Sequence, residues 1–127
     1  MLKVTERKSN RLITENGLPA YRFWPRFKGL MFQRHAGGGI HLKPCTAIHT
    51  FFMKVNIDVV YLDESGIITG IEEHLIPNRI GRRFPRTRSV LELPTGTVSR
   101  IRLSPGEQLR IEETPAQAEQ LLSSDVR

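Results

Sequence analysis

The chain of 127 residues is 39% hydrophobic and 25% charged, which is the size and composition of one soluble globular domain, here expected over residues 1–127. No apolar run approaches the ~18 residues that span a bilayer, and the opening MLKVTERKSNRL lacks the apolar stretch of a secretory signal. Cys45 is the only cysteine, so an intramolecular disulfide is excluded and a cytoplasmic location without a membrane partner is expected.

The net charge of +6 is concentrated in one part of the chain. Residues 1–106 carry 17 basic and 8 acidic residues, whereas residues 107–127 carry 2 basic and 5 acidic ones. A basic body attracts anions, so we expect an anionic ligand or a protein partner. Nucleic acid belongs to the same class of ligand, but attraction to its phosphates is too general for net charge to favour it.

The first part of the chain predicts a hairpin and a helix. Residues 11–23 alternate apolar and polar residues around Asn16 and Gly17, a pair typical of a tight hairpin turn. Residues 25–34 begin with proline and then place apolar residues at helical spacing, which predicts a short helix. The three glycines at 37–39 end it.

A long run from His49 to Tyr61 alternates apolar residues at odd positions with polar residues at even positions. This period of two predicts β-structure with the odd row buried. Because strands average about 5–6 residues, we expect a bend near Val55 and Asn56. A turn at 63–66 then leads into a returning strand that pairs with the first. The outward row comprises Thr50, Lys54, Asn56 and Asp58.

The rest of the chain predicts further strands and a last helix. Residues 89–93 read as a buried strand, 95–101 as one helical turn, and 104–112 as a tight turn and a final strand. Thr114 and the following proline start a C-terminal helix near 115–123, within an extension over 113–127. Short strands with few helices predict a mainly β domain, a small antiparallel barrel or sandwich.

Several blocks in a fixed order carry a family resemblance. The blocks are, in chain order, KGLMFQR, a glycine-rich break, IHTFFM, IDVVYLD, a Pro-x-Arg element at residues 77–79, and VLELPTG. In this order they resemble the bacterial and archaeal family called domain of unknown function 192, over residues 12–111. The resemblance implies a compact, mostly antiparallel β fold with one or two short helices. It implies no reaction, and neither the C-terminal extension nor the arginine-rich loop inherits a role from it.

Cys45, His49 and Asp58 are candidates for cysteine chemistry, as nucleophile, base and orienting carboxylate of a hydrolase or transferase. On an extended strand Cys45 and His49 lie about 13 Å apart, at ~3.3 Å per residue, so they meet only if the chain folds sharply between them. Asp58 lies at an even position and His49 at an odd one, so on an extended strand their side chains point to opposite faces. The alternative is structural: a buried thiol, a hydrogen-bonded histidine and a carboxylate that caps a loop.

Metal binding is a weaker hypothesis. Residues His35, His41, Cys45 and His49 include two intervals of four, which suit one face of a helix, but the glycines at 37–39 and Pro44 oppose a helix here. The spacing also differs from that of zinc sites. We therefore predict no metal and no cofactor.

An arginine-rich loop over residues 79–88 is the main candidate for anion binding. Guanidinium groups bind phosphates in pairs of hydrogen bonds, and the enclosed Phe84 suggests stacking on a base. We predict a binding module without catalysis of its own; the alternatives are the cysteine enzyme, and nucleic-acid or other polyanion binding through this loop. The predicted anion-binding residues are Arg79, Arg82, Arg83, Arg86 and Arg88, and the predicted ligand-binding residues are His49, Lys54, Asn56 and Arg79.

Overall fold

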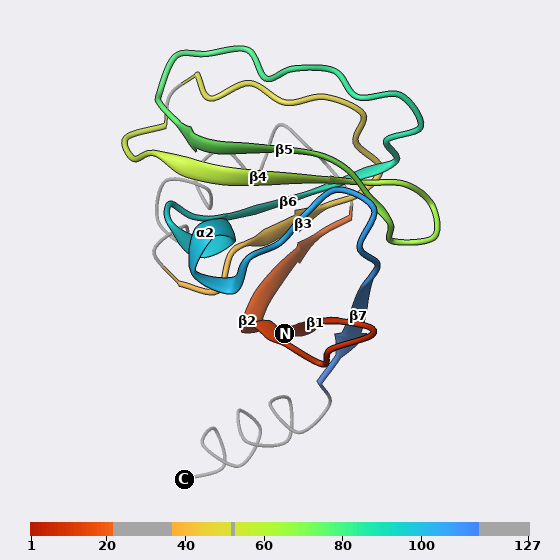
Figure 1. Ribbon diagram of the computed structural model, residues 1–127. Coiled ribbons are helices and arrows are strands. Elements are labelled where there is room, and N and C mark those ends of the chain that lie inside the picture. The colour runs from red at the N-terminus through yellow and green to blue at the C-terminus, as the bar shows by residue number, and fades with distance from the viewer. Residues whose placement is uncertain (22–36, 52, 115–127) are drawn as a thin grey trace, which may run out of the picture.

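The structure is a computed structural model that describes residues 1–21, 37–51 and 53–114. In this part of the chain seven strands form one sheet in the order β5-β4-β6-β3-β2-β1-β7 (Figure 1). All neighbours are antiparallel except β2 and β3, which run parallel. The prediction of a mainly β domain is confirmed. The elements are β1 Leu2–Glu6, β2 Leu12–Ala20, β3 Ile40–Leu42, β4 Ile57–Leu62, β5 Ile68–Leu75, β6 Ser89–Pro94, α2 Thr97–Ile101 and β7 Leu109–Glu113.

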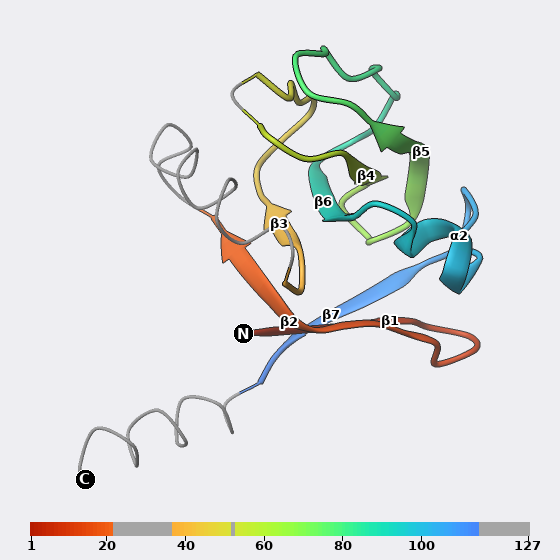
Figure 2. The same cartoon turned by 90° about the vertical axis from the view of Figure 1, so that its left-hand side faces the viewer.

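The sheet curls until its two edges touch at one point. The isolated bridge between Ile67 and Gln108 joins the start of β5 to the start of β7, and the Leu109 amide donates to the carbonyl of Gly66 at 2.8 Å. Figure 2 shows β1 and β7 crossing below the other strands, with β2 rising from them toward β3. Beyond this contact β5 and β7 do not pair with each other in the described part of the chain, so the sheet is strongly curled and is not a closed barrel.

The central strands β4 and β6 are buried on both faces, because each face covers a separate apolar cluster. The first cluster lies on the face of Leu62 and Leu91 and includes side chains from α2 and β7. The second lies on the face of Tyr61 and Val90 and includes side chains from β3 and the segment before β4. A strand buried on both faces has no polar row, so a polar residue within it needs internal partners.

The prediction of a hairpin turn at Asn16 and Gly17 is wrong. Both residues lie inside β2, where the register with β1 shifts by one residue between Leu2–Gly17 and Val4–Thr14. The pair therefore forms a bulge, for which glycine is also suited. The hairpin turn lies earlier, between β1 and β2, where Asn10 adopts a φ of 59° and its amide donates to the Glu6 carbonyl.

The long strand predicted from His49 to Tyr61 exists only in its second half. Residues 57–62 form β4, whereas the described residues from His49 to Asn56 form a loop apart from the single bridge of His49. Val55, expected in the buried row, is 47% exposed, and Thr50 and Asp58, expected outside, are fully buried. The turn at 63–66 and the antiparallel pairing of β4 with β5 are confirmed.

The helical predictions have different outcomes. The turn predicted over 95–101 is α2, and the final strand is β7. The helices predicted at 25–34 and 115–123 lie outside the described residues. Within the described ranges no helix is both long enough and apolar enough to cross a membrane.

Candidate functional site

Cys45 follows β3 and is held by local hydrogen bonds. Its amide donates to the carbonyl of Arg88 at 2.9 Å, and its thiol donates to the carbonyl of Ala47 at 3.0 Å. The side chain packs against the second apolar cluster. Burial raises the pKa of the thiol to about 11, so the sulfur stays protonated at neutral pH. A thiolate nucleophile requires the opposite environment.

His49 lies at the surface and interacts with its own neighbour. Its Nδ1 accepts from the amide of Phe51 at 3.3 Å, and the two rings stack with centroids 4.7 Å apart. The structure therefore brings His49 to neither Cys45 nor Asp58. The three residues proposed as a catalytic set do not form one site in the described chain.

Asp58 is fully buried and ties together two elements that are distant in sequence. Its Oδ1 accepts from the amide of His74 at the end of β5, at 3.0 Å. Its Oδ2 accepts from the amide of Val98 at the start of α2, at 2.9 Å. A carboxylate that satisfies amides at the start of a helix is a capping group. This geometry agrees with the structural alternative considered for Asp58.

Thr50 is a structural residue that the sequence pattern missed. Its hydroxyl donates to the carbonyl of Ile76 at 2.7 Å and accepts from the amide of Arg79 at 2.8 Å. Its backbone also exchanges hydrogen bonds with residues Asn78 and Arg79. One buried threonine thus fixes the start of the arginine-rich loop. Its partners are 26 to 29 residues away, so no local signal marks it.

A buried tyrosine and a glutamate hold the middle of the same loop. The Tyr61 hydroxyl donates to Oε1 of Glu72 at 2.6 Å, and the amide of Arg82 donates to the same oxygen at 2.8 Å. Burial and the bond to Glu72 raise the pKa of Tyr61. A Cβ at Gly81 would lie 2.5 Å from the Tyr61 hydroxyl, so only glycine lets the loop approach this closely.

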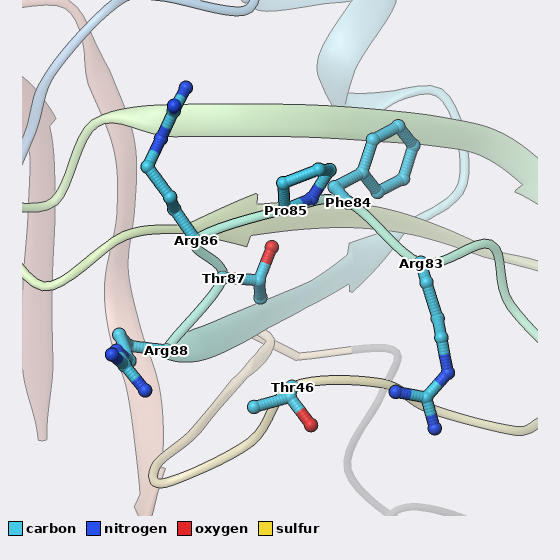
Figure 3. Close-up of a pocket in the computed structure, with 7 residues that line it drawn as sticks. All are labelled: Thr46, Arg83, Phe84, Pro85, Arg86, Thr87 and Arg88. Carbon is cyan, nitrogen blue, oxygen red and sulfur yellow. The ribbon is translucent and has the colours of Figure 1, made fainter.

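The arginine-rich loop borders a pocket of about 530 Å³. Three arginines and two hydroxyl side chains line it, and none of the lining residues is acidic. Figure 3 shows Arg83 and Arg86 pointing in opposite directions from the loop, with Thr46 on the side of Arg83. In the described part of the chain the ion pairs involve only Arg11, so these guanidinium groups have no carboxylate partner. The lining residues are Thr46, Arg83, Phe84, Pro85, Arg86, Thr87 and Arg88.

The other two arginines of the predicted set lie away from this pocket. The Arg79 guanidinium donates to the adjacent carbonyl of Asn78, at 3.4 Å. Arg82 lies over the Phe84 ring, 5.2 Å from its centroid. That ring also packs against Tyr61, at 4.7 Å, and a Cβ on Gly70 would lie 2.1 Å from it. Phe84 is thus partly buried, and its ring packs against Tyr61 and lies beneath Arg82, which leaves less of it available for stacking on a base.

The remaining predicted ligand residues do not converge. Lys54 and Asn56 are exposed in the loop before β4. Asp58, expected in the same outward row as Lys54, is instead buried and bonded to backbone amides. Of the histidines and cysteine weighed as metal ligands, His35 lies outside the described residues. The described residues contain no group of three or more potential metal ligands.

The fold and the pocket together define a small, mainly β domain that carries a cationic, anchored loop. The model of the family DUF192, Uncharacterized ACR, matches residues 7–111. The chain therefore belongs to this family, and the resemblance seen in the sequence is confirmed. No curated protein sequence matches the chain.

Two solved structures share the fold. A protein of unknown function from Novosphingobium aromaticivorans DSM 12444 superposes with a TM-score of 0.68 at 19% identity, covering 86% of this chain and 82% of that one. A protein described as a "putative transcription regulator" from Sinorhizobium meliloti 1021 superposes with a TM-score of 0.68 at 25% identity, covering 86% of this chain and 90% of that one. The first likeness shows the fold alone.

Proposed function

We propose that this protein is a cytoplasmic binding module that holds a small oxyanion, such as a phosphate group, in the pocket of the arginine-rich loop. One observation carries the proposal: Arg83, Arg86 and Arg88 line a single pocket that has no acidic lining residue, and none of them forms an ion pair among the described residues. Unpaired guanidinium groups are strong donors to phosphate and carboxylate oxygens. The cytoplasmic setting rests on the lone cysteine.

The anchoring of the loop supports a preformed site. Thr50 holds its start, Glu72 holds the Arg82 amide, and the Arg88 amide donates to the Leu62 carbonyl at 2.7 Å. A loop whose backbone is already fixed loses less conformational freedom when a ligand binds. The protonated, hydrogen-bonded thiol of Cys45 favours binding without cysteine chemistry.

The first test uses inorganic pyrophosphate titrated into the full chain by calorimetry. We expect saturable binding, and in the double variant Arg83→Gln, Arg88→Gln a Kd at least tenfold higher, because a charged hydrogen bond contributes about 1.5–3 kcal/mol. The control variant Arg100→Gln, Arg110→Gln removes the same charge from exposed positions on α2 and β7. Equal weakening in both variants, or no binding to the unaltered chain, would overturn the proposal.

Nucleic acid is the second candidate, favoured by the description of the Sinorhizobium meliloti neighbour. The packing of the Phe84 ring against Tyr61 and Gly70 argues against base stacking here. If nucleic acid is the ligand, retention on a heparin column should fall with salt and drop further in Arg82→Ala, Arg83→Ala, since each phosphate contact contributes about −0.9 to the salt slope. Retention equal to that of Arg100→Ala, Arg110→Ala would remove this candidate.

A further inference from the structure

A second pocket, of about 440 Å³, opens where β3 ends and β6 begins. This volume is within the range of small-molecule sites. One wall is apolar and belongs to the first apolar cluster or packs against it. The polar wall comes from β3 and the end of β2. The apolar wall comprises Leu62, Leu109 and Ile111, the polar wall Tyr21 and His41, and the charged lining residues are Lys43, Asp63, Glu64 and Arg88.

His41 is the unusual member of this lining. It lies in the middle of β3 opposite Leu91 and is only 4% exposed. Its Nδ1 shares a hydrogen bond of 3.0 Å with the Tyr21 hydroxyl, whose ring meets the imidazole edge-on at 5.4 Å. Its Nε2 is buried and has no hydrogen-bond partner in the described part of the chain. A buried polar atom without a partner is costly and is seldom left so.

The protonation of His41 determines what its free nitrogen can bind. Burial, with a smaller contribution from Lys43, lowers the pKa of the imidazole to about 4, so the ring is neutral at pH 7. A phenol is a better donor than acceptor, so we assign the shared hydrogen to Tyr21 and the ring hydrogen to Nε2. The unpartnered atom is then a donor that needs an acceptor.

We propose that this pocket is a second binding site, for a small molecule with an apolar body and one oxygen acceptor, a carboxylate or a carbonyl. The body packs against Leu62, Leu109 and Ile111, and the oxygen accepts from Nε2 of His41. Because Nε2 is buried, the lining around it shifts when the ligand enters, while the Tyr21 hydroxyl stays on Nδ1. Asp63, on the same lining, is held in its turn because its Oδ1 accepts from the amides of Ser65 and Ile67.

The test compares three probes of equal length, octanoate, octanamide and octylamine, by NMR on the full chain. The readouts are the His41 ring nitrogens and the methyl groups of Leu62, Leu109 and Ile111. We expect saturable shifts at these positions with octanoate and octanamide, and at least tenfold weaker binding of octylamine, which has no oxygen acceptor. In His41→Phe, which keeps a ring but removes the donor, octanamide should bind at least tenfold more weakly.

Three results would overturn this inference: no saturable shift, octylamine binding as tightly as octanamide, or shifts centred on the exposed Phe51 and Ile80 instead of this pocket. If His41→Phe fails to fold, the three probes on the unaltered chain decide alone. Arg88 lines both pockets, so the two sites are separated with Arg83→Gln. This variant should bind pyrophosphate more weakly and keep its affinity for octanoate within twofold. His41→Phe should bind octanoate more weakly and keep its affinity for pyrophosphate within twofold.

Discussion

At the residue scale, Glu92 and His41 are two ionisable side chains enclosed in the sheet. Glu92 lies in β6 opposite Ile40 and Val59, is 2% exposed, and has no hydrogen-bond partner for either oxygen among the described residues. Burial raises its pKa from 4.5 to about 8. Burial lowers the pKa of His41 from 6.5 to about 4. Both groups are therefore held in the neutral form.

These shifts give the free energy of unfolding opposite pH dependences. Between pH 4.5 and 8 folded Glu92 keeps a proton that the unfolded chain has lost, so stability falls as pH rises, by about 1.4 kcal/mol per pH unit. Between pH 4 and 6.5 His41 acts in the opposite direction, because the unfolded chain holds the extra proton. The two contributions cancel up to about pH 6.5, and only the fall due to Glu92 remains above it.

We therefore predict that Glu92→Gln abolishes the loss of stability between pH 6.5 and 8. Urea unfolding at pH 5.5, 6.5 and 8 measures it. The unaltered chain should lose about 2 kcal/mol between the last two pH values, whereas the variant should lose almost nothing. Glu73→Gln, an exposed change of the same kind on β5, serves as control. A variant that keeps the full slope would contradict the raised pKa.

At the element scale, the arginine-rich loop is held by contacts from other elements and not by structure of its own. Thr50 fixes its start, and Glu72 of β5 fixes the Arg82 amide. Asp58 plays a similar part elsewhere, joining the end of β5 to the start of α2. Side chains that accept hydrogen bonds from backbone amides in this way fix the positions of the connecting segments.

Thr50→Val tests this role of the threonine, since valine keeps the shape and removes the hydroxyl. The Arg79 amide and the Ile76 carbonyl would each lose a partner, so we expect a loss of about 2 kcal/mol in unfolding free energy and faster hydrogen exchange at Arg79. Pyrophosphate affinity should also fall. Thr50→Ser keeps the hydroxyl and should retain most of the stability and the slow exchange. Equal effects of the two changes would show that the methyl group, not the hydroxyl, matters.

Local patterns predicted some elements and misled on others. The apolar runs of β4 and β6 and the turn at 63–66 depend on neighbouring residues, so they were predictable. The pair Asn16 and Gly17 signals a reversal, but the same backbone freedom also suits a bulge. The arginine cluster was visible as a run, whereas the pocket it borders depends on Thr46, which lies about forty residues earlier. The alternation before Ile57 does not continue the strand: among the described residues of that segment, only His49 makes a ladder bridge.

At the scale of the whole molecule, the contact between β5 and β7 keeps the sheet curled around the first apolar cluster. Gly66 adopts a φ of 83°, and a Cβ there would lie 2.7 Å from the Leu109 carbonyl oxygen. This glycine thus serves both the turn after β4 and the close approach of β7. Just before β7, Glu107 pairs with Arg11, whose guanidinium also donates to the carbonyls at the end of α2.

Gly66→Ala should therefore open this contact as well as strain the turn. The matched change is Gly106→Ala, which has a similar φ of 93° but open space around the new methyl group. Left-handed backbone costs an alanine roughly 1–2 kcal/mol, and both variants should show this loss in urea unfolding. Only Gly66→Ala should lose more and speed hydrogen exchange at Ile68 and Leu109, whose amides bridge the two edges. If both variants lost equal stability and kept slow exchange, the curl would have to depend on the strand pairings and the core, because the β5–β7 contact would then add nothing.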